Sequence, residues 1–335
     1  MSTAAGSDAP LLHVEELCVE FTIGSHRLRA VDDVSFDIGR GEIVGLVGES
    51  ASGKSTLGLA IMRMVPGAGR VSAKSMKFVD QELYDLTAAE LRHVRGNDLA
   101  LIVQDALATM NPVITVGEQI TQVMRDHGEK GGRSELRRRA VHTFREVRLS
   151  EPEETLGKFP HELSGGMQQR VAIAQGLVLG PLLIIADEPT TALDVTVQAQ
   201  ILALLRGIVD DRGTSIIFIT HDLATVAEIC DRVLVMYAGR IVEAGAVGDV
   251  FADPMHPYTR ALLASLLPLD GEPPDVLTAI PGQPPQPDEW PTGCRFRPRC
   301  PLYQALGEPE ACRTTDPLVD ETVPHWAACH FVDER

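Results

Sequence analysis

The sequence has few aromatic residues, no excess of positive charge and no long apolar run. Of its 335 residues 4% are aromatic, and Lys+Arg 30 against Asp+Glu 47 gives a formal net charge of −17. This balance disfavours a nucleic-acid-binding protein or a polybasic protein of the membrane surface. The longest apolar runs, near residues 182–186 and 216–219, have the length of buried strands and are too short to span a bilayer.

The N-terminal segment MSTAAGSDAPLLH lacks a basic region followed by an apolar one. We therefore expect no export signal and a cytosolic chain. The six cysteines then argue against a disulfide framework. Cys18 and Cys230 stand alone in apolar stretches and are expected to be small buried hydrophobes. The other cysteines all follow residue 290 and need a separate explanation.

Strand-like and helix-like segments alternate along most of the chain, which predicts an α/β fold. Short V/I/L-rich runs followed by helical patterns indicate a parallel sheet covered by helices on both faces. Residues 87–165 read as a mostly helical, charged insert. From about residue 250 the composition shifts toward proline, as in DPMHPYT and PGQPPQPDEWP, which predicts a loop-rich tail.

Residues 48–55, GESASGKS, fit the pattern G-x-x-x-x-G-K-[ST] between a predicted buried strand and a helix. In such a loop successive backbone N–H groups turn toward phosphates. Lys54 adds a positive charge, and the Ser55 hydroxyl is suited to ligate Mg²⁺. The alternative, a glycine-rich turn that arose by chance, is disfavoured because both flanking elements are predicted.

Two further segments complete a candidate nucleotide site. The run LLIIADEP delivers Asp187, which can hold Mg²⁺ through water, and Glu188, which can polarise an attacking water. The string LSGGMQQR opens a helix with Ser164 and two glycines, which makes a second anion site. Within one chain, a single γ-phosphate can occupy only one of these two phosphate-binding elements. Both elements can bind the same nucleotide if two chains meet head to tail.

Over roughly residues 11–250 the sequence resembles the ATP-binding-cassette (ABC) ATPases, through motifs in that family's order. GESASGKS resembles the Walker A loop, LSGGMQQR the signature, and LLIIADEP the Walker B strand. Residues 192–194 (ALD) resemble the D-loop, Gln104 in LIVQD the Q-loop, and His221 in ITHD the switch histidine. Phe21 is placed like the aromatic residue that stacks on adenine.

The resemblance implies a dimer of cassettes with ATP and Mg²⁺ between them. Glu188 would activate water, His221 would hold water and γ-phosphate in line, and Gln104 would sense the γ-phosphate and the metal. From the residues alone, Phe21 is also compatible with a core position, Gln104 with a solvated turn and His221 with an ordinary strand end. The implied nucleotide-binding residues are Phe21, Gly48, Ser50, Ser52, Gly53, Lys54, Ser55, Thr56, Ser164, Gly165, Gly166, Gln168 and Asp194, and the implied Mg²⁺ ligands are Ser55, Gln104 and Asp187.

One position in the phosphate loop departs from the family's pattern. Ala51 stands where the family usually has glycine. If the backbone there has a positive φ, the Cβ atom costs on the order of 1–2 kcal/mol. We therefore expect ATP binding to be weaker than with glycine but present.

Several stretches narrow the resemblance to the ATPase subunits of oligopeptide/dipeptide importers, whose relatives also serve nickel. They are QDALATMNPVITVGEQI, ADEPTTALDVTVQAQIL, HPYTRALLASLLP and PTGCRFRPRCP. The chain departs at residues 106–110, where the subgroup more often reads DPMTSLNP, so the contact with a membrane subunit is expected to differ there. The resemblance implies an ABC-type nucleotide-binding domain with a RecA-like P-loop core, a helical subdomain and an antiparallel β subdomain. The implied domains are an ATPase domain at 11–250, with the helical subdomain at about 87–165, and a proline-rich C-terminal extension with the four-cysteine motif at 251–335.

The implied partners are a second ATPase subunit, more usually a different chain, two membrane permeases and an extracytoplasmic binding protein, with no nucleic acid. The expected location is the cytoplasmic face of the cell membrane. The leading hypothesis is therefore the ATP-hydrolysing subunit of a peptide importer. The alternatives are an importer of nickel or another solute, an exporter's ATPase, and a soluble cassette ATPase of translation or DNA repair.

The tail cysteines Cys294, Cys300, Cys312 and Cys329 are spaced C-x5-C-x11-C-x16-C, unlike a zinc ribbon or a ferredoxin. Four thiolates in a short proline-rich segment are enough to cage an ion. In relatives of this subgroup the corresponding cysteines hold a [4Fe–4S] cluster. Structural zinc, with His325 or His330 as substitute ligands, and no metal are the alternatives. Arg295, Arg297 and Arg299 are expected to offset thiolate charge.

Overall fold

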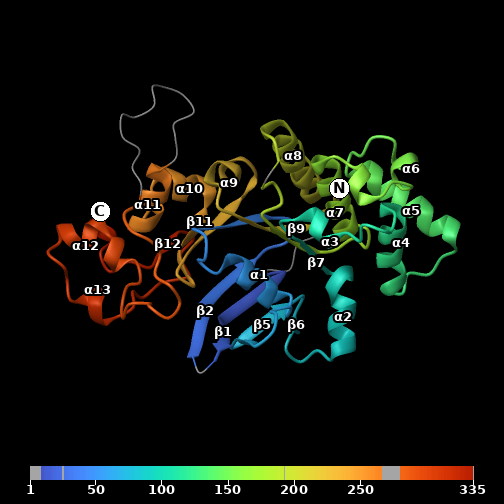
Figure 1. Cartoon of the computed structure of the whole chain (residues 1–335). Coiled ribbons are helices and arrows are strands. Elements are labelled where there is room, and N and C mark those ends of the chain that lie inside the picture. The colour runs from blue at the N-terminus through green and yellow to red at the C-terminus, as the bar shows by residue number, and fades with distance from the viewer. Residues whose placement is uncertain (1–8, 25, 192, 266–279, 335) are drawn as a thin grey trace, which may run out of the picture. The chain divides into compact units, whose positions relative to one another are not determined.

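A computed structural model describes residues 9–24, 26–191, 193–265 and 280–334, which divide into two units (Figure 1). The first unit takes its described residues from 1–39, 44–81 and 220–335. The second unit takes them from 40–43 and 82–219. The proline-rich tail therefore belongs to the same unit as the N-terminal strands and the segment that carries the phosphate loop.

An antiparallel sheet begins the first unit, seen as the long blue strands of Figure 1. Strand β1 (Leu12–Ile23) pairs with β2 (His26–Ile38), with Leu12 opposite Ile38. Strands β4 (Gly69–Ser72) and β5 (Ser75–Phe78) also pair with β1, and β6 (Gln81–Glu82) follows β5. Buried and exposed side chains alternate along the end of β2, as expected for a sheet with one face on the core.

The remaining strands of the first unit follow one another on one side of β3 (Ile43–Val47), whose five residues are all buried. Strand β10 (Arg232–Tyr237) runs parallel to β3 and antiparallel to β11 (Arg240–Ala246), which pairs with the short β12 (Trp326–Ala327). The helices of this unit are α1 (Lys54–Ile61), α9 (Leu223–Ile229), α10 (Val247–Ala252), α11 (Pro257–Ala264), α12 (Pro301–Ala305) and α13 (Ala311–Thr314), with 3₁₀ turns η2 (Arg297–Arg299) and η3 (Val332–Glu334).

The second unit contains three parallel strands. Strand β8 (Leu183–Asp187) lies between β7 (Leu99–Ile102) and β9 (Ser215–Thr220). These strands are almost entirely buried, which explains why they read as continuous apolar runs. The helices are α2 (Ala88–Asn97), α3 (Ala106–Thr109), α4 (Val116–Asp126), α5 (Arg133–Glu146), α6 (Pro152–Thr155), α7 (Gly165–Leu177) and α8 (Val195–Arg212), with the 3₁₀ turn η1 (Pro160–Glu162).

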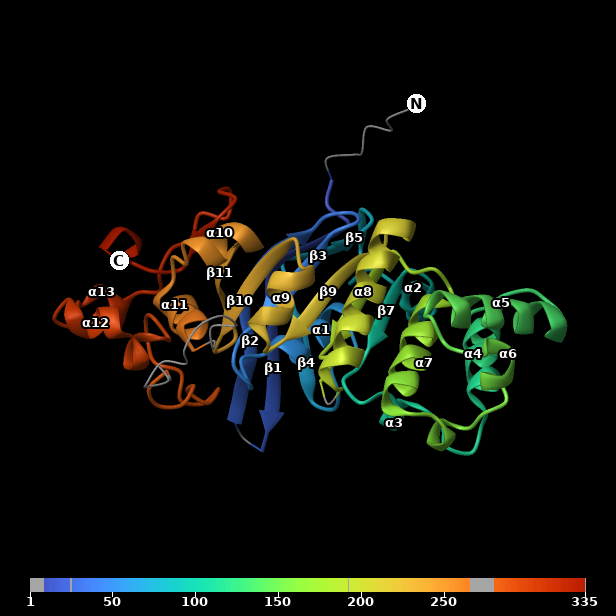
Figure 2. The same ribbon diagram turned by 90° about the horizontal axis from the view of Figure 1, so that it is seen from above.

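Figure 2 shows α4, α5, α6 and α7 gathered in green within the second unit, and α7 packs against both α4 and α5. The α/β class is confirmed, and the sheets are mixed, because β11 and β12 add antiparallel pairs beside β10. The mostly helical stretch 87–165 also contains β7, a buried strand too short to produce a recognisable alternation.

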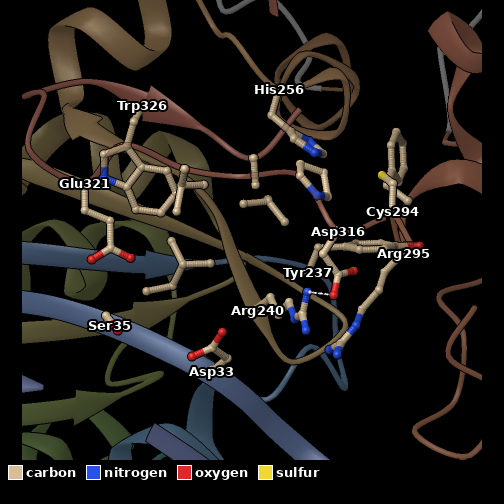
Figure 3. Close-up of a pocket in the computed structure, with 16 residues that line it drawn as sticks. Asp33, Ser35, Tyr237, Arg240, His256, Cys294, Arg295, Asp316, Glu321 and Trp326 are labelled. Atoms are coloured by element: carbon tan, nitrogen blue, oxygen red, sulfur yellow. Dashed lines mark ion pairs between the residues drawn. The ribbon is translucent and has the colours of Figure 1, made fainter. Parts of the chain in front are cut away.

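A cluster of ion pairs around Asp32 joins strand β2 to the tail. Its carboxylate, buried at 5% exposure, accepts hydrogen bonds from Arg29, Arg240 and Arg295. Arg240 is also paired with Asp316, and both line a cavity of about 100 Å³ (Figure 3). The Arg295 guanidinium lies 3.8 Å from the Trp290 ring centroid. Burial acts to raise the pKa of Asp32, but the arginines outweigh it and hold the pKa below its ordinary value.

The substitution Asp32→Asn should lower the free energy of unfolding by about 3 kcal/mol at neutral pH, because it leaves the buried Arg295 without its counter-charge. Asp32 stabilises the fold above its unfolded-state pKa, and this contribution is lost as pH falls through the lower folded-state pKa. Urea denaturation at pH 7 and near pH 3 should show the difference shrinking in acid. Asp33→Asn on the exposed neighbour is the control, and an equal effect of both variants would contradict the prediction.

Candidate functional site

The phosphate-loop sequence forms a tight turn between β3 and α1. Gly48 has φ 152 and Gly53 has φ 107, in the region that favours glycine. A Cβ atom on Gly48 would lie 2.1 Å from the Met236 carbonyl oxygen, and one on Gly53 would lie 2.5 Å from that of Ala30. Both glycines are therefore required by space as well as by backbone conformation. Helix α1 then begins at Lys54, so its N-terminus opens at the loop.

The loop backbone wraps around the side chain of Lys54. The Nζ atom donates hydrogen bonds to the carbonyl oxygens of Gly48 (2.8 Å) and Glu49 (2.9 Å), and the side chain is buried. Of the neighbouring hydroxyl residues, Ser52 is buried, Thr56 is partly buried, and Ser50 and Ser55 are exposed. A buried ammonium, exposed hydroxyls and a helix N-terminus together suit an anion such as a phosphate.

Ala51 has φ 65, which is in the left-handed region. The positive φ at which a Cβ atom causes backbone strain is therefore present at Ala51. A left-handed alanine costs about 1–2 kcal/mol relative to a residue without Cβ. The side chain is exposed, so steric conflict with neighbours does not add to this cost.

In the second unit the structure brings Gln104 and Glu188 together. Glu188 follows the last residue of β8, Asp187, and has φ 47. Its Oε2 atom accepts hydrogen bonds from Gln104 Nε2 (3.2 Å) and Thr191 Oγ1 (2.8 Å). Thr191 was not recognised from the sequence, since a threonine three residues after a carboxylate carries no distinctive signal. A left-handed glutamate costs on the order of 1–3 kcal/mol, and such strain collects at functional sites.

The segment that resembles the signature begins helix α7. Ser164 is its N-cap and its Oγ atom accepts a hydrogen bond from the Met167 amide (3.4 Å). Gly165 is exposed, and a Cβ atom on Gly166 would lie 2.8 Å from Val197 Cγ1, so close packing requires glycine at 166. Gln168 Nε2 donates to the carbonyl oxygens of Pro160 and Leu163, and therefore holds the preceding turn.

The other predicted residues are placed as follows. Asp194 is the N-cap of α8 and accepts a hydrogen bond from the Val197 amide, while Ala192 lies outside the described residues. His221 is exposed and directly follows β9. Phe21 is partly buried in β1, where it pairs with Gly69. Phe21, the phosphate loop and His221 belong to the first unit, whereas Gln104, Asp187, Glu188, Ser164 and Asp194 belong to the second.

The four tail cysteines line a single cavity of the first unit, together with His330, Phe296 and Phe331 among others. The Cys294 amide donates to the Cys312 carbonyl oxygen at 3.0 Å. Burial raises the pKa of all four thiols, that of Cys294 to about 12. Within the described residues, no group of three or more histidine, cysteine or acidic side chains is arranged to hold a metal ion. The expected cluster is therefore not supported as a formed site.

Two expectations about the surroundings of the cysteines need correction. Arg295 is engaged by Asp32 and Arg299 by Glu49, so these two charges are neutralised by carboxylates and do not serve the thiols. Arg297 does line the cavity, and it donates to main-chain carbonyl oxygens. His325 is not among the residues that line the cavity, and its Nε2 lies 2.8 Å from a Glu243 oxygen.

Comparisons with known proteins identify the relatives of the chain. The family model described as "ABC transporter" matches residues 31–191, and the model "Oligopeptide/dipeptide transporter, C-terminal region" matches residues 242–305. The chain is 48% identical to the oligopeptide transport ATP-binding protein AppD of Bacillus subtilis (strain 168) over 97% of this chain and 98% of the relative. It is 42% identical to the dipeptide transport ATP-binding protein DppD of Escherichia coli (strain K12), with 96% of each covered.

Solved structures give the same result for the fold. The dimeric post-hydrolysis ATP-binding cassette MJ0796, bound to ADP and Pi, is 26% identical, with a TM-score of 0.64 over 70% of this chain and 98% of the other. CbiO1 of Clostridium perfringens is 29% identical, with a TM-score of 0.62 over 73% of this chain and 91% of the other. The fold and the motifs thus define an ABC-type ATPase cassette. Within the ABC transporters, the chain belongs to the family of oligopeptide/dipeptide transport ATP-binding proteins.

The substitution Ala51→Gly should raise the free energy of unfolding by about 1 kcal/mol. It relieves about 1–2 kcal/mol of strain in the folded state, and part of this gain is offset because glycine increases the conformational entropy of the unfolded chain. Affinity for MgATP should rise with it, since the loop then adopts its conformation at lower cost. Ala51→Val, which adds a branched side chain at positive φ, should lower stability. Urea denaturation and nucleotide titration measure both effects, and unchanged values for the glycine variant would show that alanine is neutral.

Proposed function

We propose that this chain is the ATP-hydrolysing subunit of a multi-subunit importer that takes up oligopeptides or dipeptides. The observation that carries the proposal is the near-complete alignment with ATP-binding proteins named for oligopeptide and dipeptide transport. The phosphate loop around Lys54 and the Gln104–Glu188 pair are the chemical features that this activity needs. Among the described residues, no helix is both long enough and apolar enough to cross a membrane.

In the proposed mechanism the phosphate loop binds the β- and γ-phosphates of ATP. The loop N–H groups and the Lys54 ammonium bind the phosphate oxygens, and Phe21 stacks on adenine. Mg²⁺, when bound, neutralises phosphate charge, and Ser55, Gln104 and Asp187 are the oxygen donors that would hold it. The donor set suits this hard cation, since Ser55 is exposed at the loop and Asp187 lies at the carboxyl end of β8.

Hydrolysis requires a water activated beside the γ-phosphate. Glu188 is the proposed base, and its carboxylate is oriented by Gln104 and Thr191. His221 is proposed to hold the water and the γ-phosphate in line. Two hydrogen bonds from neighbouring side chains restrict the rotamers of Glu188, so little entropy is lost when the water binds.

A partner cassette is needed because the chain carries two phosphate-binding elements. We propose that Ser164, Gly165 and Gly166 act on the nucleotide of the partner, with Asp194 linking the two sites. Ser164 and Gly165 are exposed at the N-terminus of α7, where the helix dipole favours an anion. The cassette MJ0796, whose solved structures are dimeric, is one of the similar structures.

The proposed assembly contains a second ATPase subunit, two membrane permeases and an extracytoplasmic binding protein, and it places this chain on the cytoplasmic face of the membrane. Residues 11–250 would form the ATPase domain, with the helical subdomain at about 87–165, and residues 251–335 the extension. Leu107 in α3, three residues after Gln104, is 46% exposed, and Val113 is 78% exposed. Exposed apolar side chains in this segment suit a contact with a membrane subunit.

The substitution Glu188→Gln should abolish steady-state ATP hydrolysis and leave MgATP binding intact, because the amide keeps the hydrogen-bonding shape but cannot accept a proton. Source cells carrying this variant should lose uptake of labelled di- to pentapeptides. Glu154→Gln on the exposed surface is the matched control and should retain uptake. Loss of hydrolysis with unchanged peptide uptake would direct the search to nickel, another solute or export.

We further propose that the tail cysteines hold a [4Fe–4S] cluster, with zinc as the alternative. The support is the donor set, four thiols on the wall of one largely apolar cavity, and the resemblance stated above. Burial raises the pKa of the thiols and so favours their protonated form. A cluster bound there would hold the cysteines as thiolates. The metal would be structural, since the tail segment has little apolar content of its own.

Anaerobic purification of the full chain should give a brown protein with iron and acid-labile sulfide in equal amounts. Cys312→Ser should lose most of both, whereas Cys230→Ser, outside the cavity, should retain them. Elemental analysis that finds zinc without sulfide would replace the cluster by zinc. A colourless protein with neither metal would contradict the proposal.

A further inference from the structure

Residues of the tail contact the phosphate loop at Glu49, a position that the loop pattern leaves unspecified. The Arg299 guanidinium donates to both carboxylate oxygens of Glu49, at 2.6 Å and 3.0 Å. This two-pronged geometry is the strongest arrangement available to an arginine and a carboxylate. Arg299 lies in the RPRC string next to Cys300, about 250 residues along the chain from its partner.

Contacts other than the one with Glu49 also hold the Arg299 side chain in place. Its Nε atom donates to the Pro281 carbonyl oxygen at 2.8 Å, and its side chain is only 5% exposed. Burial acts to lower the pKa of Arg299, but hydrogen bonds to Glu49 and Tyr237 outweigh it and raise the pKa. The guanidinium is therefore a positive charge held at one place. A surface arginine carries the same charge but has no fixed position.

The main chain of Glu49 is held as well. Its amide donates to the hydroxyl oxygen of Tyr258 at 2.8 Å. Tyr258 belongs to the HPYT segment, is fully buried, and packs on Tyr237 with ring centroids 4.6 Å apart. Phe296, close to Arg299 in the tail, packs edge-on against Tyr237. The packing of these three rings thus fixes the position of the Tyr258 hydroxyl, which accepts the hydrogen bond from the Glu49 amide.

The third contact of Glu49 leads to the phosphate site itself. Its carbonyl oxygen accepts a hydrogen bond from Lys54 Nζ at 2.9 Å. One residue of the loop is therefore bound at its amide by Tyr258, at its side chain by Arg299 and at its carbonyl by the lysine of the phosphate site. Any displacement of Glu49 moves an acceptor of Lys54.

The charge of Glu49 gives this arrangement a functional reason. A carboxylate in a loop that binds phosphates repels the ligand, and the repulsion is strong where water is excluded. Glu49 is 25% exposed, so solvent screens its charge only in part. Neutralisation by Arg299 removes the repulsion and keeps the carboxylate on the tail side of the loop.

We propose that the C-terminal tail is coupled to nucleotide binding through Glu49, because Arg299 neutralises its carboxylate and Tyr258 positions its main chain. The inference rests on the proposed function, because it concerns the same nucleotide site. It assigns a role to the tail within the chain's own ATP chemistry. The tail is thereby a part of the nucleotide-binding machinery and not only an attachment to it.

The test compares nucleotide affinity of full-length variants by equilibrium titration with MgADP and MgATP. Arg299→Gln should weaken binding about tenfold, the loss expected for one charge-assisted pair, with the rate at saturating ATP close to that of the unsubstituted chain. Tyr258→Phe, which keeps the ring and removes the hydroxyl, should weaken binding about threefold. Arg297→Gln is the matched control, since Arg297 donates only to tail carbonyl oxygens among its described hydrogen bonds, and it should bind as before.

A double variant separates this role from a general effect on folding. Glu49→Gln combined with Arg299→Gln removes both charges, so affinity should return to within about twofold of the unsubstituted chain. A purely structural loss would remain in the double variant or grow. If Arg299→Gln does not fold, Arg299→Lys keeps the charge without the fork and should give an affinity about threefold lower.

Unchanged affinity in Arg299→Gln, or a double variant as weak as the single one, would overturn the inference while the proposed function stands. An unsubstituted chain that binds neither nucleotide would overturn the proposed function and the inference together. The two failures are therefore distinguishable in one set of titrations.

Discussion

The burial of the Lys54 ammonium is the constraint on which the phosphate site depends. A buried positive charge must be surrounded by oxygen atoms, and the loop backbone provides them by turning its carbonyl groups toward Nζ. That turn requires positive φ at Gly48 and Gly53 and leaves no space for a side chain at either position. It also places Ala51 in the left-handed region, so this chain carries strain at a point where the backbone favours glycine.

Ion pairs between residues far apart in the sequence connect the tail to the rest of the first unit. Asp32 and Glu49 each lie near the beginning of the chain, and Arg295 and Arg299 near its end. Both pairs are substantially buried, so each carboxylate must remain matched with its arginine. Arg295 and Arg299 lie in the sequence between Cys294 and Cys300, two of the four cysteines that line the cavity. A ligand bound there would stabilise the segment that carries both partners.

The motifs allowed the local backbone form of the candidate site to be predicted, because each motif is a contiguous string of residues. The phosphate loop, the strand ending at Asp187 and the helix beginning after Ser164 are of this kind. Contacts between distant side chains could not be predicted in this way. Thr191 against Glu188 and Arg299 against Glu49 have no spacing that identifies them. The arginines beside the cysteines were expected to face the thiols, and the buried carboxylates attracted two of them instead.

The sequence by itself determined the class of protein, the alternation of strands and helices along most of the chain and the form of the phosphate loop, since these follow from local patterns of apolar residues, glycine and charge. Only the tertiary structure decided which arginine neutralises which carboxylate, that four cysteines share one cavity, and that the tail contacts the loop at Glu49. The physical reason is that ion pairing and burial depend on distances in space, which chain folding sets and residue spacing does not.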